Sequence, residues 1–415
     1  MSKICYTVKA FSILQMKKSD GEIEELFNRG VAEIIEAASL RAKLVSGKKL
    51  RAKLGIDPTS PNLHIGRAVV LWKLRAFQEL GHTAVLIIGD FTGLVGDTSD
   101  KDAERPMLSE KEVQKNLKSY FDQAYKILDP KKTETHFNSE WLKKLTFRDV
   151  GELADLFGLH EFEAREIISR RLKAGKRVSL RELLYPLMQG YDSMAVRADV
   201  ELGGTDQKFN LLAGRVIQKH FGQNSQDIVI TKLLAGTDGR KMSSSWGNTI
   251  NLTDEANEIF GKVMSISDEL ILPYFELATN VEEAELQAIG AQLSGRKENP
   301  RTLKVRLARE IVTLYHGNAA TSSAAQNFEK KFGREKDVTQ IRPDVLLKKK
   351  SGPYKIDEIL LEAKLVSSKS EARRKRGEGA VRFNGRKLSE HEHDDLIVFQ
   401  KGDIISLGRR FLKID

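Results

Sequence analysis

Two short loops carry residue types that are suited to holding phosphate groups. Residues 58–67 (PTSPNLHIGR) lie between a strand-like stretch and the start of a helix, where backbone N–H groups and the helix dipole favour anions. Gly66 would let a flat ligand approach the backbone, and His64 could donate a hydrogen bond to a phosphate oxygen. Taken alone, a histidine at a helix start is also typical of a cap or a packing residue.

The second loop, residues 236–245 (GTDGRKMSSS), combines glycines, two cations and several hydroxyl side chains. It is not a Walker A loop, because the required spacing before its lysine is absent. It follows a later strand-like segment, so in a parallel sheet it could face the same crevice as the first loop. A plain surface turn is the alternative interpretation.

The residues around the first loop predict one strand–helix–strand unit. Residues 51–56 alternate as a strand does, and apolar residues between 64 and 80 recur at helical spacing up to Gly81, which fits a helix C-terminal cap. Residues 84–88 (AVLII) form a run typical of a strand buried on both faces of a parallel sheet. This pattern predicts an α/β fold that opens a doubly wound, Rossmann-like sheet.

The rest of the chain divides into further regions. Helical patterns occupy 109–128 and 150–187, and a strand-like run follows at 227–234. A polar helical region covers 268–331, and a lysine-rich linker is expected at 348–353. A small α+β piece comes last, with helices near 355–363 and 368–376 and strands near 381–383 and 404–407. A length of 415 residues also predicts two or three domains.

Composition excludes several classes of protein. A single cysteine, Cys5, cannot form an internal disulfide, and no apolar run is long enough for a membrane helix. Residues 1–20 lack the apolar core of a secretory signal, so we expect a disordered extension, with Met16 as another candidate start. The HEH segment at 391–393 is expected to be a solvated loop rather than a metal site.

The positive charge of the chain is concentrated near its C-terminus. The formal net charge is +10, and residues 364–387 hold nine Lys and Arg against two Glu. A basic cluster on an otherwise nearly neutral chain indicates a polyanionic partner, although a solvated lysine-rich face is the simpler alternative.

The two loops, in this order, resemble the signatures of class I aminoacyl-tRNA synthetases. Residues 64–67 (HIGR) are similar to the HIGH motif and residues 241–245 (KMSSS) to the KMSKS motif. Further segments resemble bacterial tyrosyl-tRNA synthetases: 55–59 (GIDPT), 89–97 (GDFTGLVGD), 185–192 (YPLMQGYD) and 199–210 (DVELGGTDQKFN). Residues 367–374 (SSKSEARR) resemble a small RNA-binding module shared with a ribosomal protein.

Three positions depart from the family pattern. Arg67 stands where HIGH ends in histidine, and Ser244 stands where KMSKS usually has its second lysine. Lys53 replaces a tyrosine that lies beside the substrate hydroxyl in the best-known branch, so that role is not carried over. The departures at positions 67 and 244 concern the contacts with ATP rather than the reaction that the resemblance implies, in which tyrosine and ATP give tyrosyl-adenylate before transfer to tRNA.

The resemblance implies roles for residues in the catalytic region. Residues expected to act in catalysis are Thr59, His64, Lys101, Arg105, Lys241 and Ser244. Residues expected to bind ATP are Gly55, Asp57, His64, Gly66, Arg67, Gly204, Asp206, Lys241, Ser244 and Ser245. Magnesium would arrive with ATP, with no protein-ligated metal.

A stripe on one predicted helix would recognise tyrosine. Tyr185, Gln189 and Asp192 lie at i, i+4 and i+7, on one helix face. By resemblance Asp192 accepts from the phenol, whereas the full tyrosine-binding set is Thr92, Asp97, Tyr185, Gln189, Asp192 and Gln207. A packing face is the alternative for such a stripe, but polar side chains disfavour it.

The resemblance also implies domains and partners. We expect a Rossmann-like catalytic domain with a helical insertion (22–267), a helical anticodon-binding domain (268–346) and an RNA-binding domain (353–415). The expected tRNA contacts are Lys369, Arg373, Arg374, Arg376 and Arg386. A cytoplasmic homodimer without membrane association is expected. The alternatives are an RNA-binding protein that has lost catalysis, and the tryptophanyl relative.

Overall fold

A computed structural model describes residues 20–97, 107–117, 119–295, 298–332, 343–388, 396–408 and 410–415. The chain forms two compact units, one ending at Tyr315 and the other beginning at His316. No helix in these ranges is long and apolar enough to cross a bilayer. Lys101, Arg105, Cys5 and the HEH segment lie outside the described residues.

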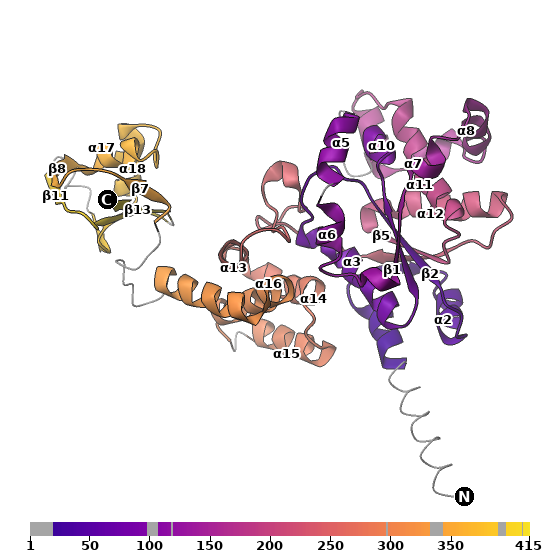
Figure 1. Cartoon of the computed structure of the whole chain (residues 1–415), viewed down its shortest axis with the longest axis horizontal. Coiled ribbons are helices and arrows are strands. Elements are labelled where there is room, and N and C mark those ends of the chain that lie inside the picture. Colours follow the sequence, from indigo (N-terminus) through magenta and orange to yellow (C-terminus); the bar gives the residue numbers. More distant parts are fainter. Residues whose placement is uncertain are drawn as a thin grey trace, which may run out of the picture. The chain divides into compact units, whose positions relative to one another are not determined.

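The first unit is built around a six-stranded sheet (Figure 1). Its strands are β1 (Val31–Ile35), β2 (Arg51–Ile56), β3 (Thr83–Ile88), β4 (Thr133–Phe137), β5 (Val200–Gly204) and β6 (Asp227–Thr231). They lie in the order β1-β6-β5-β2-β3-β4, and all neighbours are parallel except β1 and β6. This confirms the predicted α/β class with a mainly parallel sheet.

The predicted strand–helix–strand unit is β2–α3–β3. Strand β2 has the predicted bounds, and β3 begins one residue before the predicted run. Helix α3 (Ile65–Glu79) is amphipathic, and its buried face includes Leu71, Leu74 and Phe77. The apolar run of β3 is buried because the strand has neighbours on both edges and helices on the sheet faces.

Helices fill the long connections between the strands. In chain order up to β5 they are α2 (Ala37–Val45), α3, α4 (Thr92–Val95), α5 (Glu110–Leu117), α6 (Tyr120–Ala124), α7 (Ser139–Leu142), α8 (Phe147–Ala154), α9 (Leu159–Glu163), α10 (Glu166–Lys173) and α11 (Leu180–Ala195). After β5 come α12 (Lys208–His220), α13 (Ala256–Met264), α14 (Ile271–Ala278), α15 (Glu283–Ser294) and α16 (Pro300–Phe332). Helix α16 is interrupted at Gly317 (φ 77°), and the residues after Tyr315 belong to the second unit. Short 3-10 turns occur at Pro130–Lys132, Thr205–Gln207, Ser244–Trp246 and Asp268–Leu270.

Helix α11 has strong start signals and positions much of the site. Ser179 and Glu182 form a capping box at its N-terminus. Glu182 also pairs with Arg171 of α10 through two hydrogen bonds of 2.5 and 3.1 Å, and both side chains are fully buried. This ion pair ties α10 to the first turn of α11.

The second unit is a small α+β fold, as predicted. Its elements are β7 (Val345–Leu347), β8 (Gly352–Lys355), α17 (Ile356–Glu362), α18 (Lys369–Gly377), β9 (Val381–Phe383), β10 (Arg386–Lys387), β11 (Leu396–Phe399), β12 (Ile404–Leu407) and β13 (Arg410–Ile414). The main sheet has the order β10-β9-β12-β13-β7, and β8 pairs with β11. Ile359, Leu360, Ala372 and Leu412 are among its core residues.

The expectation of a linker at 348–353 is wrong in structural terms. Strand β7 precedes this segment and pairs with β13, while Pro353 pairs with Val398 of β11. The segment is thus an internal connection of the second unit, and its lysines lie on a turn between two strands. The division into three domains with the predicted boundaries stays a prediction.

We predict that Arg171→Met destabilises the first unit by about 3–5 kcal/mol, because the buried Glu182 carboxylate would lose its cation. The matched control is Arg170→Met on the same helix, whose pair with Glu166 is solvent-exposed and should change stability by less than about 1 kcal/mol. Urea unfolding with hydrogen exchange at α10 and α11 would compare them. Equal effects of the two variants would contradict the prediction.

Candidate active site

The site lies where the strand order of the sheet reverses. Strands β3 and β4 follow on one side of β2, whereas β5 and β6 lie on the other. Ligands bind at the carboxyl ends of strands at such a switch point. A cavity of about 560 Å³ opens there, with Gly55 and Asp57 from the end of β2 and Gly204 and Asp206 from the end of β5 among its lining residues.

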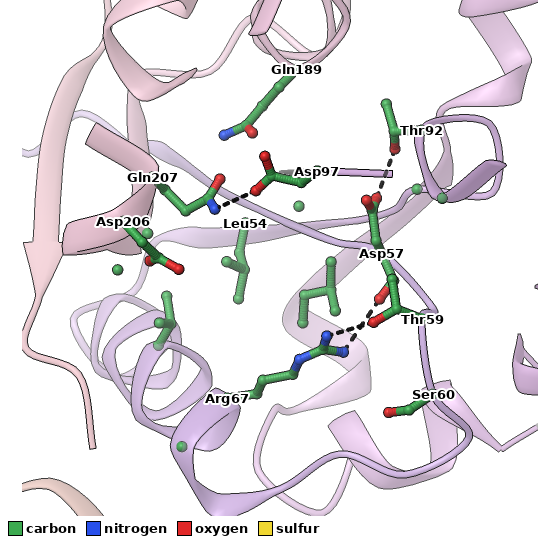
Figure 2. A pocket seen from close by; sticks show the side chains of 18 of the residues that line it. Leu54, Asp57, Thr59, Ser60, Arg67, Thr92, Asp97, Gln189, Asp206 and Gln207 are labelled. Atoms are coloured by element: carbon green, nitrogen blue, oxygen red, sulfur yellow. Dashed lines mark hydrogen bonds between the residues drawn. The ribbon is translucent and has the colours of Figure 1, made fainter. Parts of the chain in front are cut away.

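The structure brings together almost all the predicted catalytic-region residues. The described ones that line this cavity are Gly55, Asp57, Thr59, His64, Gly66, Arg67, Thr92, Asp97, Tyr185, Gln189, Asp192, Gly204, Asp206, Gln207, Lys241 and Ser244. Of Ser245 only the backbone is described. Figure 2 shows that Asp97, Gln189 and Gln207 lie in one part of the cavity and Thr59, Ser60 and Arg67 in another.

His64 begins α3 as its N-cap. Its Nδ1 accepts a hydrogen bond from the backbone N–H of Arg67 at 3.3 Å. Burial, together with the charges of Arg67 and Lys241, lowers the pKa of His64 to about 3. The ring is therefore neutral, and because Nδ1 accepts, its proton is on Nε2, which can donate to an anion.

Arg67 braces the loop that follows β2. Its Nη2 donates to Thr59 Oγ1 at 2.8 Å, and its Nη1 donates to the Tyr120 hydroxyl at 2.5 Å and to the Asp57 carbonyl at 3.3 Å (Figure 2 shows the bonds to residues 57 and 59). Because Thr59 Oγ1 accepts from Arg67, the Thr59 hydroxyl proton can point to another acceptor. Tyr120, on α6, is a supporting residue that the sequence did not indicate.

The two signature loops lie against each other. The chain just after the second loop pairs with the first loop, because the backbone N–H of Ile65 donates to the Ile250 carbonyl at 2.9 Å and that of Leu252 donates to the Leu63 carbonyl at 2.8 Å. Lys241 pairs with Asp206 at 2.7 Å, and the Ser244 and Ser60 hydroxyls are 3.5 Å apart. The second loop is therefore part of the cavity wall rather than a separate surface turn.

Asp57 accepts hydrogen bonds from two cavity side chains. The Thr92 hydroxyl donates to Oδ1 at 2.7 Å and the Tyr185 hydroxyl to Oδ2 at 2.8 Å. Burial raises the pKa of Asp57 to about 6, although both hydrogen bonds oppose this shift. Gly89 must remain small here, because a Cβ atom would lie 2.0 Å from Asp57 Oδ1.

Asp192 sits at the far end of the α11 stripe, buried beside β4 and α7. Trp141 Nε1 donates to its Oδ1 at 2.7 Å and Asn138 Nδ2 donates to its Oδ2 at 3.2 Å. Burial raises the pKa of Asp192 to about 7, and the nearby Lys53 opposes that rise. Sequence reasoning missed Asn138 and Trp141, because the polar strand β4 (TETHF) gives no strand signal.

Two other members of the predicted pocket are held by neighbours. Gln207 Nε2 donates to Asp97 Oδ2 at 2.7 Å (Figure 2), and Gln189 Nε2 donates to Glu201 Oε1 at 3.1 Å. The cavity therefore has Asp97, Gln207 and Gln189 in one part and Arg67 in another (Figure 2), while Lys241 pairs with the cavity carboxylate of Asp206. Such an arrangement suits a ligand with an ammonium group near one end and phosphates near the other.

The predicted RNA contacts on the second unit divide into two kinds. Lys369, Arg373, Arg374 and Arg386 are exposed. Arg376 is a correction: it is 2% exposed and its guanidinium pairs with Asp357 of α17 at 3.3 Å, so it stabilises the unit and is not available to a partner. Its spacing of four residues from the buried Ala372 places it on the inner face of α18.

Comparisons with known proteins agree on one family. A family model described as class I tRNA synthetases (W and Y) matches residues 46–333. The chain is 44% identical over 396 residues to a tyrosine–tRNA ligase of Dehalococcoides mccartyi, covering 95% of this chain and 98% of that one. It is 46% identical over 399 residues to one of Carboxydothermus hydrogenoformans, covering 94% and 97%.

Solved structures agree in fold. A mitochondrial tyrosyl-tRNA synthetase of Aspergillus nidulans has a TM-score of 0.62 at 20% identity, covering 75% of this chain and 94% of that chain. One from Archaeoglobus fulgidus complexed with L-tyrosine has a TM-score of 0.59 at 21% identity, covering 74% and 99%.

We predict that Asp192→Asn removes a pH dependence of stability. The folded chain retains a proton on Asp192 up to about pH 7, whereas the unfolded chain loses it near pH 4. Stability contributed by this proton is thus present below pH 4 and is lost as the pH rises to 7. The free energy of unfolding of the wild type, relative to the variant, should fall by at most about 1.4 kcal/mol per pH unit in that window.

Urea unfolding followed by tryptophan fluorescence, to which Trp141 beside Asp192 contributes, would measure both proteins at each pH. Parallel curves for the two proteins between pH 4 and 7 would show that Asp192 does not retain a proton there.

Proposed function

The chain belongs to the class I tRNA synthetases of the tryptophanyl and tyrosyl group, in its tyrosyl branch, and we propose that its switch-point cavity is where tyrosine reacts with ATP. The chain is a tyrosine–tRNA ligase, which forms tyrosyl-adenylate and then transfers the tyrosyl group to the 3′ end of its tRNA. One observation carries the assignment of the cavity: both signature loops and the polar stripe of α11 line it together.

Tyrosine would be held at its ammonium group and at its phenol. The oxygens of Asp97, Tyr185 and Gln189 can accept from its ammonium group, since each lines the cavity. At the other end the phenol would donate to Asp192, which Asn138 and Trp141 hold in place. Phenylalanine would leave this buried carboxylate without that donor, the general reason why a site built for a hydroxyl rejects the analogue lacking it.

Thr92 and Gln207 fix the orientation of the residues that would bind the ammonium group. Thr92 donates to Asp57, which in turn accepts from the Tyr185 hydroxyl, so the direction of that hydroxyl is fixed. Burial raises the pKa of Tyr185 well above its usual range, so it remains a phenol. Gln207 holds Asp97 in the same way.

The reaction needs no general base, because the tyrosine carboxylate itself attacks the α-phosphorus of ATP. Catalysis then consists of positioning and of stabilising charge on the transferring phosphate. The Nε2–H of His64 and the hydroxyl of Thr59 would donate to phosphate oxygens, and Lys241 and Ser244 would act on the pyrophosphate. Asp206 would accept from the ribose, with Gly55, Gly66 and Gly204 allowing close approach. Lys101, Arg105 and Ser245 keep their roles as predictions from the family.

Magnesium would enter bound to the phosphate oxygens of ATP. The cavity carboxylates do not converge on one point: Asp57 accepts from Thr92 and Tyr185, Asp97 from Gln207, and Asp206 from Lys241. In the described ranges no three His, Cys, Asp or Glu side chains group as metal ligands do. The ion would supply further charge neutralisation at the phosphates.

The second unit would bind tRNA through the exposed face of α18 and the neighbouring β10. Arg373 and Arg374 are about two-thirds exposed, and their pairs with Asp357 and Glu378 are long, at 3.3 and 4.0 Å. Such cations can exchange an internal carboxylate for an RNA phosphate at little cost. Lys369 and Arg386 would add to the same contact.

A homodimer in the cytoplasm is the remaining part of the proposal. Helices α8, α9 and α11 pack through a cluster that includes Leu153, Phe162 and Leu187. They also expose Phe147, Leu159 and Leu180, of which Phe147 is 95% exposed. Exposed apolar side chains on neighbouring helices are typical of an interface, and we propose that a second copy covers them.

We predict that wild-type protein catalyses tyrosine-dependent ATP–pyrophosphate exchange and that Asp192→Ala lowers its kcat/KM for tyrosine by about 10- to 100-fold, because the phenol loses its buried hydrogen-bond acceptor. The control Asp122→Ala changes an exposed aspartate of α6 and should leave the exchange rate unchanged. Wild-type protein that binds tRNA but gives no exchange would instead favour an RNA-binding protein that has lost catalysis.

We also predict a specific salt dependence of tRNA binding. Arg373→Gln combined with Arg374→Gln should reduce the slope of log K against log salt by about 1–2, since about two phosphate contacts are lost. Filter binding between low and moderate KCl would measure the slope. The control Lys48→Gln, at the amino end of β2, should keep the wild-type slope. An unchanged slope in the double variant would place the tRNA contact elsewhere.

A further inference from the structure

Behind the cavity lies a buried ion pair that the proposed reaction does not use. Lys53 and Glu201 are opposite each other in the register of β2 and β5, and neither side chain is more than 1% exposed. Lys53 Nζ lies 2.7 Å from Glu201 Oε1, 2.8 Å from Ser193 Oγ and 2.9 Å from the Gln189 carbonyl. All three donors of the ammonium are thereby matched, so Lys53 faces away from the ligand.

Glu201 gathers donors from four side chains. Its Oε1 accepts from Lys53 and from Gln189 Nε2, and its Oε2 accepts from the Ser193 hydroxyl at 2.9 Å and from Gln226 Nε2. A buried carboxylate with this set of donors is fully satisfied, and the cation beside it offsets its charge. Its orientation is therefore fixed by the core and does not depend on a ligand.

This carboxylate decides which end of the Gln189 amide faces the cavity. An ionised carboxylate only accepts hydrogen bonds, so the Gln189 atom that contacts Glu201 must be the NH₂ group. The amide oxygen is then directed away from Glu201, and Gln189 lines the cavity. An oxygen is the atom that an ammonium group needs, whereas an NH₂ group there would repel it.

We propose that Glu201, neutralised by Lys53, is a positioning residue that fixes the amide polarity of Gln189 so that its oxygen accepts from the ammonium group of the substrate. This inference rests on the proposed placement of tyrosine. It explains why position 53 can hold a lysine: the side chain acts on Gln189 through Glu201 rather than on the phenol.

The test compares three ligands on the full chain: L-tyrosine, tyramine, which keeps the ammonium but lacks the carboxylate, and 3-(4-hydroxyphenyl)propionate, which lacks the ammonium. In Glu201→Gln the partner of Gln189 can donate as well as accept, so the amide polarity is no longer fixed. We expect the Kd of tyrosine and of tyramine to rise about tenfold or more, and that of the propionate to change less than about twofold.

Two further variants make the result specific. Ser193→Ala removes a donor to Glu201 Oε2 but leaves the Gln189 bond to Oε1, so it should not discriminate among the three ligands. In a Gln189→Ala background, Glu201→Gln should add no further loss of tyrosine affinity. Because Glu201→Gln leaves a buried cation, Lys53→Met/Glu201→Gln, which removes both charges, should show the same pattern among ligands.

The outcomes separate this inference from the proposed function. Equal losses for all three ligands in both Glu201 variants, or no loss for any, would overturn the positioning role while the wild type still binds tyrosine. An additive loss in the Gln189→Ala background would overturn it as well. A wild type that binds neither tyrosine nor tyramine would overturn the proposed placement of the substrate and this inference with it.

Discussion

The short pairing between β2 and β5 is the constraint on which the site depends. Strand β2 is in register with β3 over six residue pairs but with β5 over only two, Ala52 with Val200 and Lys53 with Glu201. Beyond the second pair Leu54 and Leu202 line the cavity instead of pairing with each other. The Lys53–Glu201 ion pair thus stands at the last register position before the cavity begins, and it joins the two halves of the sheet where the backbone ladder stops.

The buried charges around this point give the cavity its two ends. Asp57, just after β2, is half-buried and Asp192, on α11, is buried, and desolvation raises the pKa of both. Each is kept in place by neutral donors rather than by a cation within its hydrogen-bonding distance. Arg67, Lys241 and the N-terminus of α3 supply positive potential to the same cavity. The ammonium group of a zwitterionic substrate can therefore lie near carboxylates while the negative charges of a polyphosphate lie near cations, so neither is placed against a like charge.

How far the sequence predicts this arrangement depends on the kind of strand. The apolar strands β2 and β3 were found almost to the residue, because their pattern comes from burial. Strands β4 (TETHF) and β5 (VELGG) were not, because a hydroxyl, an acid or a glycine at these positions serves the site and removes the apolar signal. Asn138, Trp141 and Glu201, which lie on or just after these strands, were missed for the same reason.

In the basic C-terminal cluster the sequence predicts one site residue too many, whereas in the catalytic region it misses several. Composition treats all its cations alike, yet Arg376 is buried against Asp357 while Arg373 and Arg374 face outward. Only the helix period, with Ala372 and Arg376 four residues apart, separates the structural arginine from the exposed ones.

The departures in the two signature loops can be judged by their contacts. The Arg67 guanidinium donates to Thr59, to Tyr120 and to the carbonyl of Asp57, so an arginine at this position braces the loop that follows β2. Lys241 is paired with Asp206, the proposed ribose ligand, and both side chains are partly exposed, so this pair contributes little stability. In the proposed placement of ATP, a ribose hydroxyl that binds Asp206 would compete for the same carboxylate and would release Lys241 toward the phosphates. Binding of the nucleoside and movement of the Lys241 ammonium to the pyrophosphate would then be coupled, and this coupling would not require a lysine at position 244.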